Sequence, residues 1–225
     1  LLSVTIFLPL VGALIIFLIK EDHSSANNIK WAALWTSLGT FISSCLLWMQ
    51  FDTSTANYQF VEKYSWFTDF NFFYHVGVDG ISLFMILLST FLTPFCILAS
   101  WESIKKRIKE YMMAFLFLET VMIGMFSSID MLLFYIFFEA LLIPMFLIIG
   151  IWGGDRRIYA SFKLFLYTLL GSVLMLIAII FIYQSTDSMN IEKLQGNIFT
   201  KEIQIYLWLA FFASFAVKIP MWPFH

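Results

Sequence analysis

Charged residues are scarce in this chain. Only 12% of its 225 residues are charged and 61% are hydrophobic, whereas soluble globular domains carry about 25% charged residues. No hydrophilic segment is long enough to fold around a core of its own, so the composition excludes a soluble domain. The net charge of −2 gives no excess of basic residues for binding nucleic acid.

Cofactor motifs are missing as well. The sequence has no GxGxxG, P-loop or CxxC pattern, so nucleotide, phosphate and iron–sulfur sites have no support. Of the three histidines, His23 and His75 fall in polar connections, which disfavours a haem held between histidines of two helices. Cys45 and Cys96 lie singly in separate apolar runs and are expected to pack in a membrane. We therefore expect this chain to bind no cofactor or metal and to perform no redox chemistry itself.

Apolar runs of about 20 residues recur along the chain, and each is long enough to cross about 30 Å of hydrocarbon as a helix. They predict an all-α fold, a polytopic transmembrane helical bundle. The predicted helices span residues 2–19, 31–51, 79–100, 111–128, 131–151, 158–183 and 203–222. The connection 52–78 is rich in aromatic residues, which favour the headgroup level, so it is predicted to lie on the membrane surface.

Lysine and arginine are distributed unevenly between the connections. Nine of the thirteen basic residues lie in the connections 20–30, 101–110 and 152–157 or in the helix start that follows the last of these. These connections alternate onto one face of the membrane. By the positive-inside rule this face is the cytoplasm or the mitochondrial matrix.

Glu139 lies in the middle of the apolar run from Phe134 to Pro144. A helix rise of 1.5 Å per residue places it about 12 Å deep, where an ionisable group costs at least about 2.5 kcal/mol on insertion scales. Pro144 cannot donate to the carbonyl of Ala140, so the helix is expected to be irregular beside the acid. The alternative is a structural acid satisfied by a neighbouring helix. We favour a functional acid because ionisable residues within membranes are functional by default.

Lys218 is the natural counter-charge. Pro220 frees the carbonyl of Ala216, so the last helix is predicted to be broken at Pro220, and discontinuous helices build ion sites in many transporters. Because buried charges are costly unless they are paired, we expect Glu139 and Lys218 to approach closely. The alternative for Lys218 is a side chain that snorkels from a helix end.

Further residues are candidates for a proton path. Lys163 either snorkels toward the basic turn before it or faces inward as a relay, and both readings stay open. Glu119 is a second deep acid, which either extends the path or pairs with a hydroxyl. His225 is a candidate relay because histidine has a pKa of about 6.5. Asp79 and Asp130 stand at helix ends and are predicted to be caps.

The stretches around these residues resemble one family closely. They are Phe134 to Met145, Ile148 to Gly154 with its Trp-Gly-Gly turn, Lys163 to Ser172, and Ala216 to His225. Their sequences resemble the proton-pumping subunit M of bacterial NADH–quinone oxidoreductase, whose mitochondrial counterpart is chain 4 of complex I. The resemblance covers most of the chain and is weakest over 20–75.

The resemblance implies an antiporter-like half-channel. In it, Glu139 and Lys218 form the charged pair that controls proton occupancy, and Lys163 is a relay on the inner side. It implies no role for Glu119. It further implies other membrane-arm subunits as partners, with NADH, flavin, iron–sulfur clusters and quinone bound in partner subunits. The membrane is then the bacterial cytoplasmic membrane or the mitochondrial inner membrane.

We divide the chain into N-terminal helices (1–110) and an incomplete first antiporter-like repeat (111–225), and we expect an N-terminal fragment that lacks the family's second, inverted repeat. The alternatives are a subunit of a multisubunit sodium/proton antiporter and a structural membrane scaffold. The sequence around Glu139 and the Trp-Gly-Gly turn favours the respiratory subunit over the antiporter. A Glu139→Gln variant that assembles distinguishes a pump from a scaffold.

Overall fold

The structure is a computed structural model that describes residues 1–20, 25–67, 72–194 and 199–222. Its helices are α1 (Leu2–Leu18), α2 (Ala26–Gln50), α3 (Gly80–Ala99), α4 (Ile108–Ser127), α5 (Met131–Ala140), α6 (Leu142–Trp152), α7 (Arg157–Thr186), α8 (Ile191–Leu194) and α9 (Lys201–Lys218), and its strands are β1 (Gln59–Phe67) and β2 (Phe72–Val78). The predicted helical class is thus confirmed. Counting α5 and α6 together, five helical stretches of the described chain are long and apolar enough to cross a membrane.

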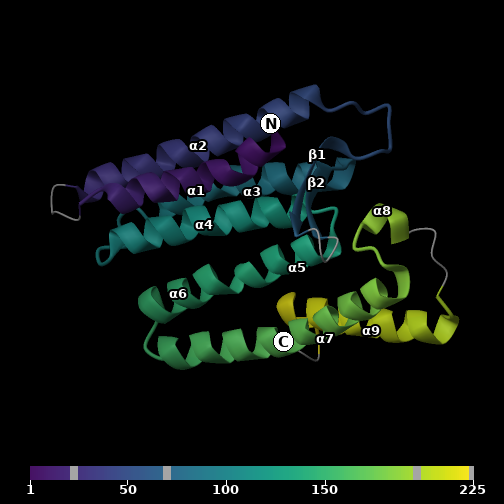
Figure 1. The fold of residues 1–225 in the computed structure, drawn as a ribbon. Coiled ribbons are helices and arrows are strands. Elements are labelled where there is room, and N and C mark those ends of the chain that lie inside the picture. Colours follow the sequence, from purple (N-terminus) through teal and green to yellow (C-terminus); the bar gives the residue numbers. More distant parts are fainter. Residues whose placement is uncertain (21–24, 68–71, 195–198, 223–225) are drawn as a thin grey trace.

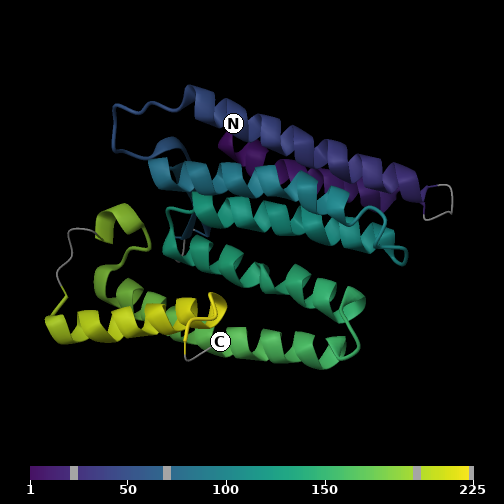
Figure 2. The ribbon, with the colours of Figure 1, turned by 180° about the vertical axis from the view of Figure 1, so that it is seen from behind.

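The long helices run side by side in layers (Figure 1). α1 to α4 pack against one another, α5 and α6 lie along α4, and α7 with α9 forms the far layer against α6 and α5. The view from behind shows the same order (Figure 2). Two apolar clusters fill the bundle of α1 to α4, one at each end of it.

The basic connections gather at one end of the bundle, as the sequence predicts. The ammonium of Lys109 donates to the carbonyls of Phe17 at 2.7 Å and Ile19 at 2.8 Å, which ties the start of α4 to the end of α1. The indole N–H of Trp152 donates to the carbonyl of Lys106 at 2.8 Å. The turns before α4 and after α6 therefore lie together.

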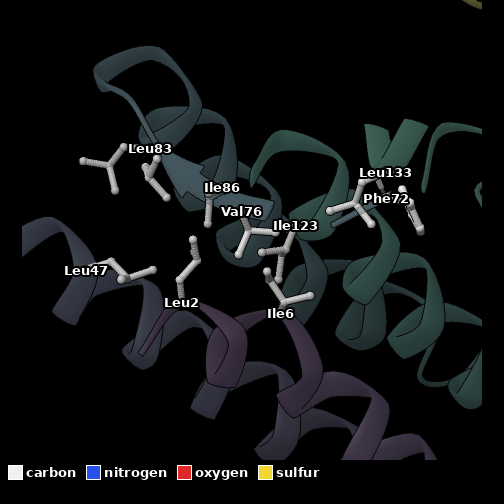
Figure 3. Packing of buried hydrophobic residues seen from close by; sticks show 10 residues of the cluster. Leu2, Ile6, Leu47, Phe72, Val76, Leu83, Ile86, Ile123 and Leu133 are labelled. Atoms are coloured by element: carbon white, nitrogen blue, oxygen red, sulfur yellow. The ribbon is translucent and has the colours of Figure 1, made fainter. Parts of the chain in front are cut away.

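The opposite end carries a β-hairpin where the sequence analysis expected an irregular loop over 52–78, and the position of this segment at the membrane surface stays a prediction. β1 and β2 are antiparallel, with Lys63 opposite His75. Val76 is buried with Ile6, Ile86 and Ile123 in one of the apolar clusters (Figure 3). The aromatic and β-branched residues of this segment favour strands, and their pairing lets the hairpin cover the helix ends.

Two segments from later in the chain extend this hairpin. The N–H of Ile129 donates to the carbonyl of His75 at 3.0 Å, and the N–H of Ile191 donates to the carbonyl of Ile129 at 3.0 Å. The turn between α4 and α5 is thus held between β2 and the segment before α8. Asp79 and Asp130 cap α3 and α5 as predicted, since the carboxylate of each accepts N–H groups of the first helical turn.

Two irregular points in the helices lie where proline predicts them. The predicted helix 131–151 is divided at Leu141, between α5 and α6, three residues before Pro144. The last helix ends at Lys218 rather than at 222. The N–H of Met221 donates to the carbonyl of Ala216 at 2.9 Å, which is the carbonyl that Pro220 cannot satisfy.

Candidate functional site

Glu139 lies at the end of α5, two residues before the interruption at Leu141. Its side chain is partly buried, and the buried Oε1 atom has no hydrogen-bond partner among the described residues. A buried carboxylate oxygen without a partner carries a desolvation penalty of about 1–3 kcal/mol. The carboxyl group is therefore open to a mobile partner, either a proton or a cation.

Lys218, the last residue of α9, reaches the residue beside Glu139. Its ammonium donates a hydrogen bond to the backbone carbonyl of Phe138 and lies 3.4 Å from the centre of the Phe138 ring. Between Glu139 and Lys218, both within the described residues, no ion pair forms. A carbonyl dipole and an aromatic face hold the cation, one residue away from the acid, and the expected close approach of the two side chains stays a prediction.

Close packing of α7 and α9 positions this ammonium. A Cβ atom added to Gly171 of α7 would lie 3.0 Å from the Cβ of Val217, so glycine allows the two backbones to approach. The ring of Phe215 packs edge-on against Phe138, with centroids 5.8 Å apart. The first contact fixes α9 at the middle of α7 and the second fixes it against α5, which together place Lys218 at the depth of the helix interruption.

Lys163 shares an open groove with Lys218. The groove has a volume of about 1040 Å³. Its lining includes Arg156, Arg157, Lys163, Tyr167, Lys218 and Pro220. The ammonium of Lys163 lies 5.8 Å from the centre of the Tyr159 ring. The groove joins the basic turn between α6 and α7 to the partly buried Lys218, so Lys163 lies between that turn and Lys218.

Ser214 is a polar residue of this region that the sequence analysis missed. It is 1% exposed, and its hydroxyl oxygen has no hydrogen-bond partner within the described chain. A spacing of four residues places it on the same face of α9 as Lys218. Its only sequence signal is a hydroxyl in an otherwise apolar run.

The remaining candidates lie elsewhere. Glu119 is completely buried in α4, and both carboxylate oxygens lack a partner among the described residues. His225 lies outside the described residues. In the described part of the chain no cluster of three or more His, Cys, Asp or Glu side chains could hold a metal ion. The structure therefore gathers Lys163, Lys218 and Glu139 around α9 and sets Glu119 apart.

Family models match residues 4–225 in two parts. Residues 4–128 match "NADH-ubiquinone oxidoreductase chain 4, amino terminus". Residues 128–225 match "NADH:quinone oxidoreductase/Mrp antiporter, TM". The first match alone covers more than half of the chain.

Curated relatives extend this likeness. NADH-quinone oxidoreductase subunit M of Rickettsia prowazekii is 50% identical over 230 residues, covering 100% of this chain and 46% of the relative. NADH-ubiquinone oxidoreductase chain 4 of Marchantia polymorpha is 49% identical over 225 residues, covering 100% of this chain and 45% of the relative. The chain thus spans about half the length of the relatives that it matches.

Solved structures share the fold. A chain of respiratory complex I from Thermus thermophilus with bound NADH superposes with a TM-score of 0.87 at 23% identity, over 100% of this chain and 45% of that one. A chain of the membrane-bound sulfane sulfur reductase, an archaeal respiratory membrane complex, superposes with a TM-score of 0.73 at 19% identity, over 96% of this chain and 33% of that one. At these identities the likeness concerns the fold alone.

Proposed function

This chain belongs to the NADH-ubiquinone oxidoreductase chain 4 family, and from that premise we propose that it is a proton-translocating membrane-arm subunit of a respiratory NADH–quinone oxidoreductase. Its partners are then other membrane-arm subunits, in the bacterial cytoplasmic membrane or the mitochondrial inner membrane. The oxidoreductase reaction is that of the complex, with NADH, flavin, iron–sulfur clusters and quinone bound by partner subunits. The division into 1–110 and 111–225 stays a prediction.

The observation that carries the proposal is the ammonium of Lys218 beside the interrupted helix that bears Glu139. The lysine binds the carbonyl of Phe138, and the acid is the next residue. When Glu139 is ionised, its charge attracts the ammonium, and when it is protonated the attraction ends. One proton on Glu139 therefore shifts Lys218 between two adjacent acceptors.

Lys163 supplies the next step of the proposed path. It lines the groove that also exposes Lys218, toward the basic turn of Arg156 and Arg157. A proton released from Lys218 into this groove can pass to Lys163, which lines the groove between Lys218 and the basic turn. The proposed relay therefore runs from Glu139 through Lys218 to Lys163, while His225 is kept as a candidate from the sequence.

The two alternatives from the sequence have less support. The relatives at about 50% identity carry the names of NADH-quinone oxidoreductase subunits, which favours the respiratory subunit over a sodium/proton antiporter. A structural scaffold needs its buried charges to be satisfied. The buried oxygen of Glu139 has no partner in the described chain, which favours a carboxyl group that exchanges protons.

The test is made in the intact complex, in membrane vesicles. Glu139→Gln keeps the shape of the side chain but cannot ionise, so NADH-driven proton pumping and the coupled quinone reduction should fall on the order of 100-fold, the low end for a positioned proton-transfer group. Glu139→Asp should retain much more activity. Lys218→Ala should be severe and Lys218→Arg intermediate at best, because arginine stays protonated at any accessible pH.

Glu202→Gln, an exposed acid in the first turn of α9, is the matched control and should pump normally. Assembly is checked on a native gel. An assembled Glu139→Gln complex with normal pumping would mean that the carboxylate is structural, and the proposed function would be lost.

A further inference from the structure

Glu119 is a buried acid that the proposed relay does not use. Its side chain is 0% exposed, and neither carboxylate oxygen has a hydrogen-bond partner among the described residues. An isolated charge in an apolar interior is strongly unfavourable because it loses its hydration, and in practice such a group becomes neutral instead. This carboxyl group therefore needs a positive partner or a proton.

The helix face of Glu119 points away from Glu139. The α5-facing side of α4 is marked by Gly124, where an added Cβ atom would lie 2.6 Å from the Phe137 ring. Five residues separate Gly124 from Glu119, which at 3.6 residues per turn places them about 140° apart around the helix. Leu116 and Ile123 share the face of Glu119, and both pack against α1 and α3.

Glu119 thus lies at the level between two apolar clusters. Ile123 packs with Ile6 and Ile86 in one cluster, as Figure 3 shows, and Leu116 packs with Ala13 and Ile97 in the other. Along α3, the residues between Ile86 and Ile97 include three buried polar side chains. They are Ser89, Thr90 and Thr93.

Hydroxyl pairs link the helices in this layer and next to it. The hydroxyls of Ser44 in α2 and Thr90 in α3 lie 2.7 Å apart within the layer, and those of Thr5 in α1 and Ser43 in α2 lie 2.6 Å apart, beside Leu2 and Ile6 of the first cluster. The layer between the clusters is therefore polar on α2 and α3, while α4 contributes Glu119.

The layer is rich in acceptors and poor in donors. The hydroxyls of Ser89, Thr90 and Thr93 donate to carbonyls of their own helix, at 2.8, 3.0 and 2.9 Å. Each hydroxyl oxygen then has only lone pairs to offer. Pro94 lacks the N–H that would bind the carbonyl of Thr90, and this adds one more acceptor. Such a layer suits a group that brings a hydrogen to donate.

Ionic partners for Glu119 are missing from the neighbouring helices. α1 and α3 contain no Asp, Glu, Lys, Arg or His. The only such residue of α2 is Lys30, which binds the carbonyl of Trp101 at the basic end. On α5, Glu139 lies on the other side of α4 and has the same sign of charge. A proton is thus the positive partner that these helices leave open.

We propose that Glu119 and the hydroxyl layer of α2 and α3 form a second proton-binding site, separate from the relay of Glu139, Lys218 and Lys163. The carboxyl group holds its own proton and is neutral at pH 7, since its oxygens have no partner in the described chain and the helices around it offer no cation. This site stands whether or not the chain pumps protons, so it goes beyond the proposed function.

Infrared difference spectroscopy of the intact complex tests the site. At pH 7 in KCl, the carbonyl-stretch band of a protonated carboxylic acid should be present in the wild type and absent in Glu119→Gln. Glu110→Gln is the matched control, because Glu110 is exposed in the first turn of the same helix, and it should keep the band. Glu119→Asp should keep the band at a shifted frequency. This variant provides the test if Glu119→Gln fails to assemble.

Identical spectra for the wild type and Glu119→Gln would overturn the proposal, because Glu119 would then carry no proton. A band that disappears when NaCl replaces KCl would also overturn it, because sodium would then be the ligand. Glu139→Gln should keep the Glu119 band, so failure of the proposed pump and failure of this site are distinguishable.

Discussion

At the scale of single residues, the cation of the site is held by its neighbours and not by the acid. Lys218 binds the carbonyl and the ring of Phe138, which are polar or polarisable but carry no net charge. The ammonium therefore has no direct ion-pair partner among the described residues, although its carbonyl acceptor is the residue next to Glu139. A small movement of one lysine side chain is enough to change the ionic environment of the acid.

Asp130 gives a prediction at the same scale. It is 2% exposed and accepts the N–H groups of Leu132 and Leu133 as the cap of α5. Burial outweighs these hydrogen bonds and raises the pKa of Asp130 from 3.8 to about 6. Because the folded pKa lies above the unfolded value, the stabilisation is complete below pH 3.8 and is lost as the pH rises through about 6.

The free energy needed to unfold the first turn of α5 locally should therefore fall by up to about 3 kcal/mol as the pH rises from 4 to 7. Hydrogen exchange of the Leu132 and Leu133 amides in the intact complex measures this free energy. Asp130→Asn keeps the cap and should flatten the pH dependence. Asp187→Asn, at the exposed end of α7, should leave it unchanged. A flat profile in the wild type would contradict the raised pKa.

At the scale of elements, the sequence predicted what depends on local pattern. Each apolar run became a helix, and Pro144 and Pro220 marked the irregular points. The hairpin was missed because its strands are stabilised by contacts with α1, α3 and α4, which are distant in sequence. The contact of Lys218 with the carbonyl of Phe138 was missed for a related reason: no residue pattern tells whether an ammonium reaches a side chain or a backbone carbonyl.

The contact between α7 and α9 gives a prediction for these elements. In Gly171→Leu, the new side chain would meet Val217, whose Cβ and Cγ2 lie 3.0 and 3.1 Å from the position that a Cβ atom would take. Overpacking typically costs about 1–3 kcal/mol, and relief of it moves α9 and Lys218 away from Phe138. Proton pumping should fall although every ionisable residue is present.

Gly80→Leu is the control, because a Cβ atom at Gly80 meets nothing within 4 Å. Both variants are compared as assembled complexes, by pumping and by the thermal stability of the complex. If Gly171→Leu pumps as well as Gly80→Leu, the close approach of α7 and α9 does not position the site.

At the scale of the whole molecule, the two ends of the bundle differ in charge and construction. One end collects the turns that contain Lys106 and Arg156, joined through Trp152. The other is covered by the hairpin and α8. The groove with Lys163 opens beside the basic turn, so the direction of the proposed path depends on which end faces the cytoplasm or matrix.

Cysteine accessibility in sealed vesicles decides the orientation. Starting from a Cys45→Ser and Cys96→Ser background, Lys106→Cys should be labelled by a membrane-impermeant maleimide from the cytoplasmic or matrix side, because the positive-inside rule places basic connections there. Lys193→Cys in α8 should be labelled from the opposite side. Leu170→Cys, which is 72% exposed in the middle of α7, should resist labelling from both sides, because the reaction needs water.

Labelling of Lys106→Cys and Lys193→Cys from the same side would contradict the bundle's two-ended topology, and reversal of both sides would contradict only its orientation.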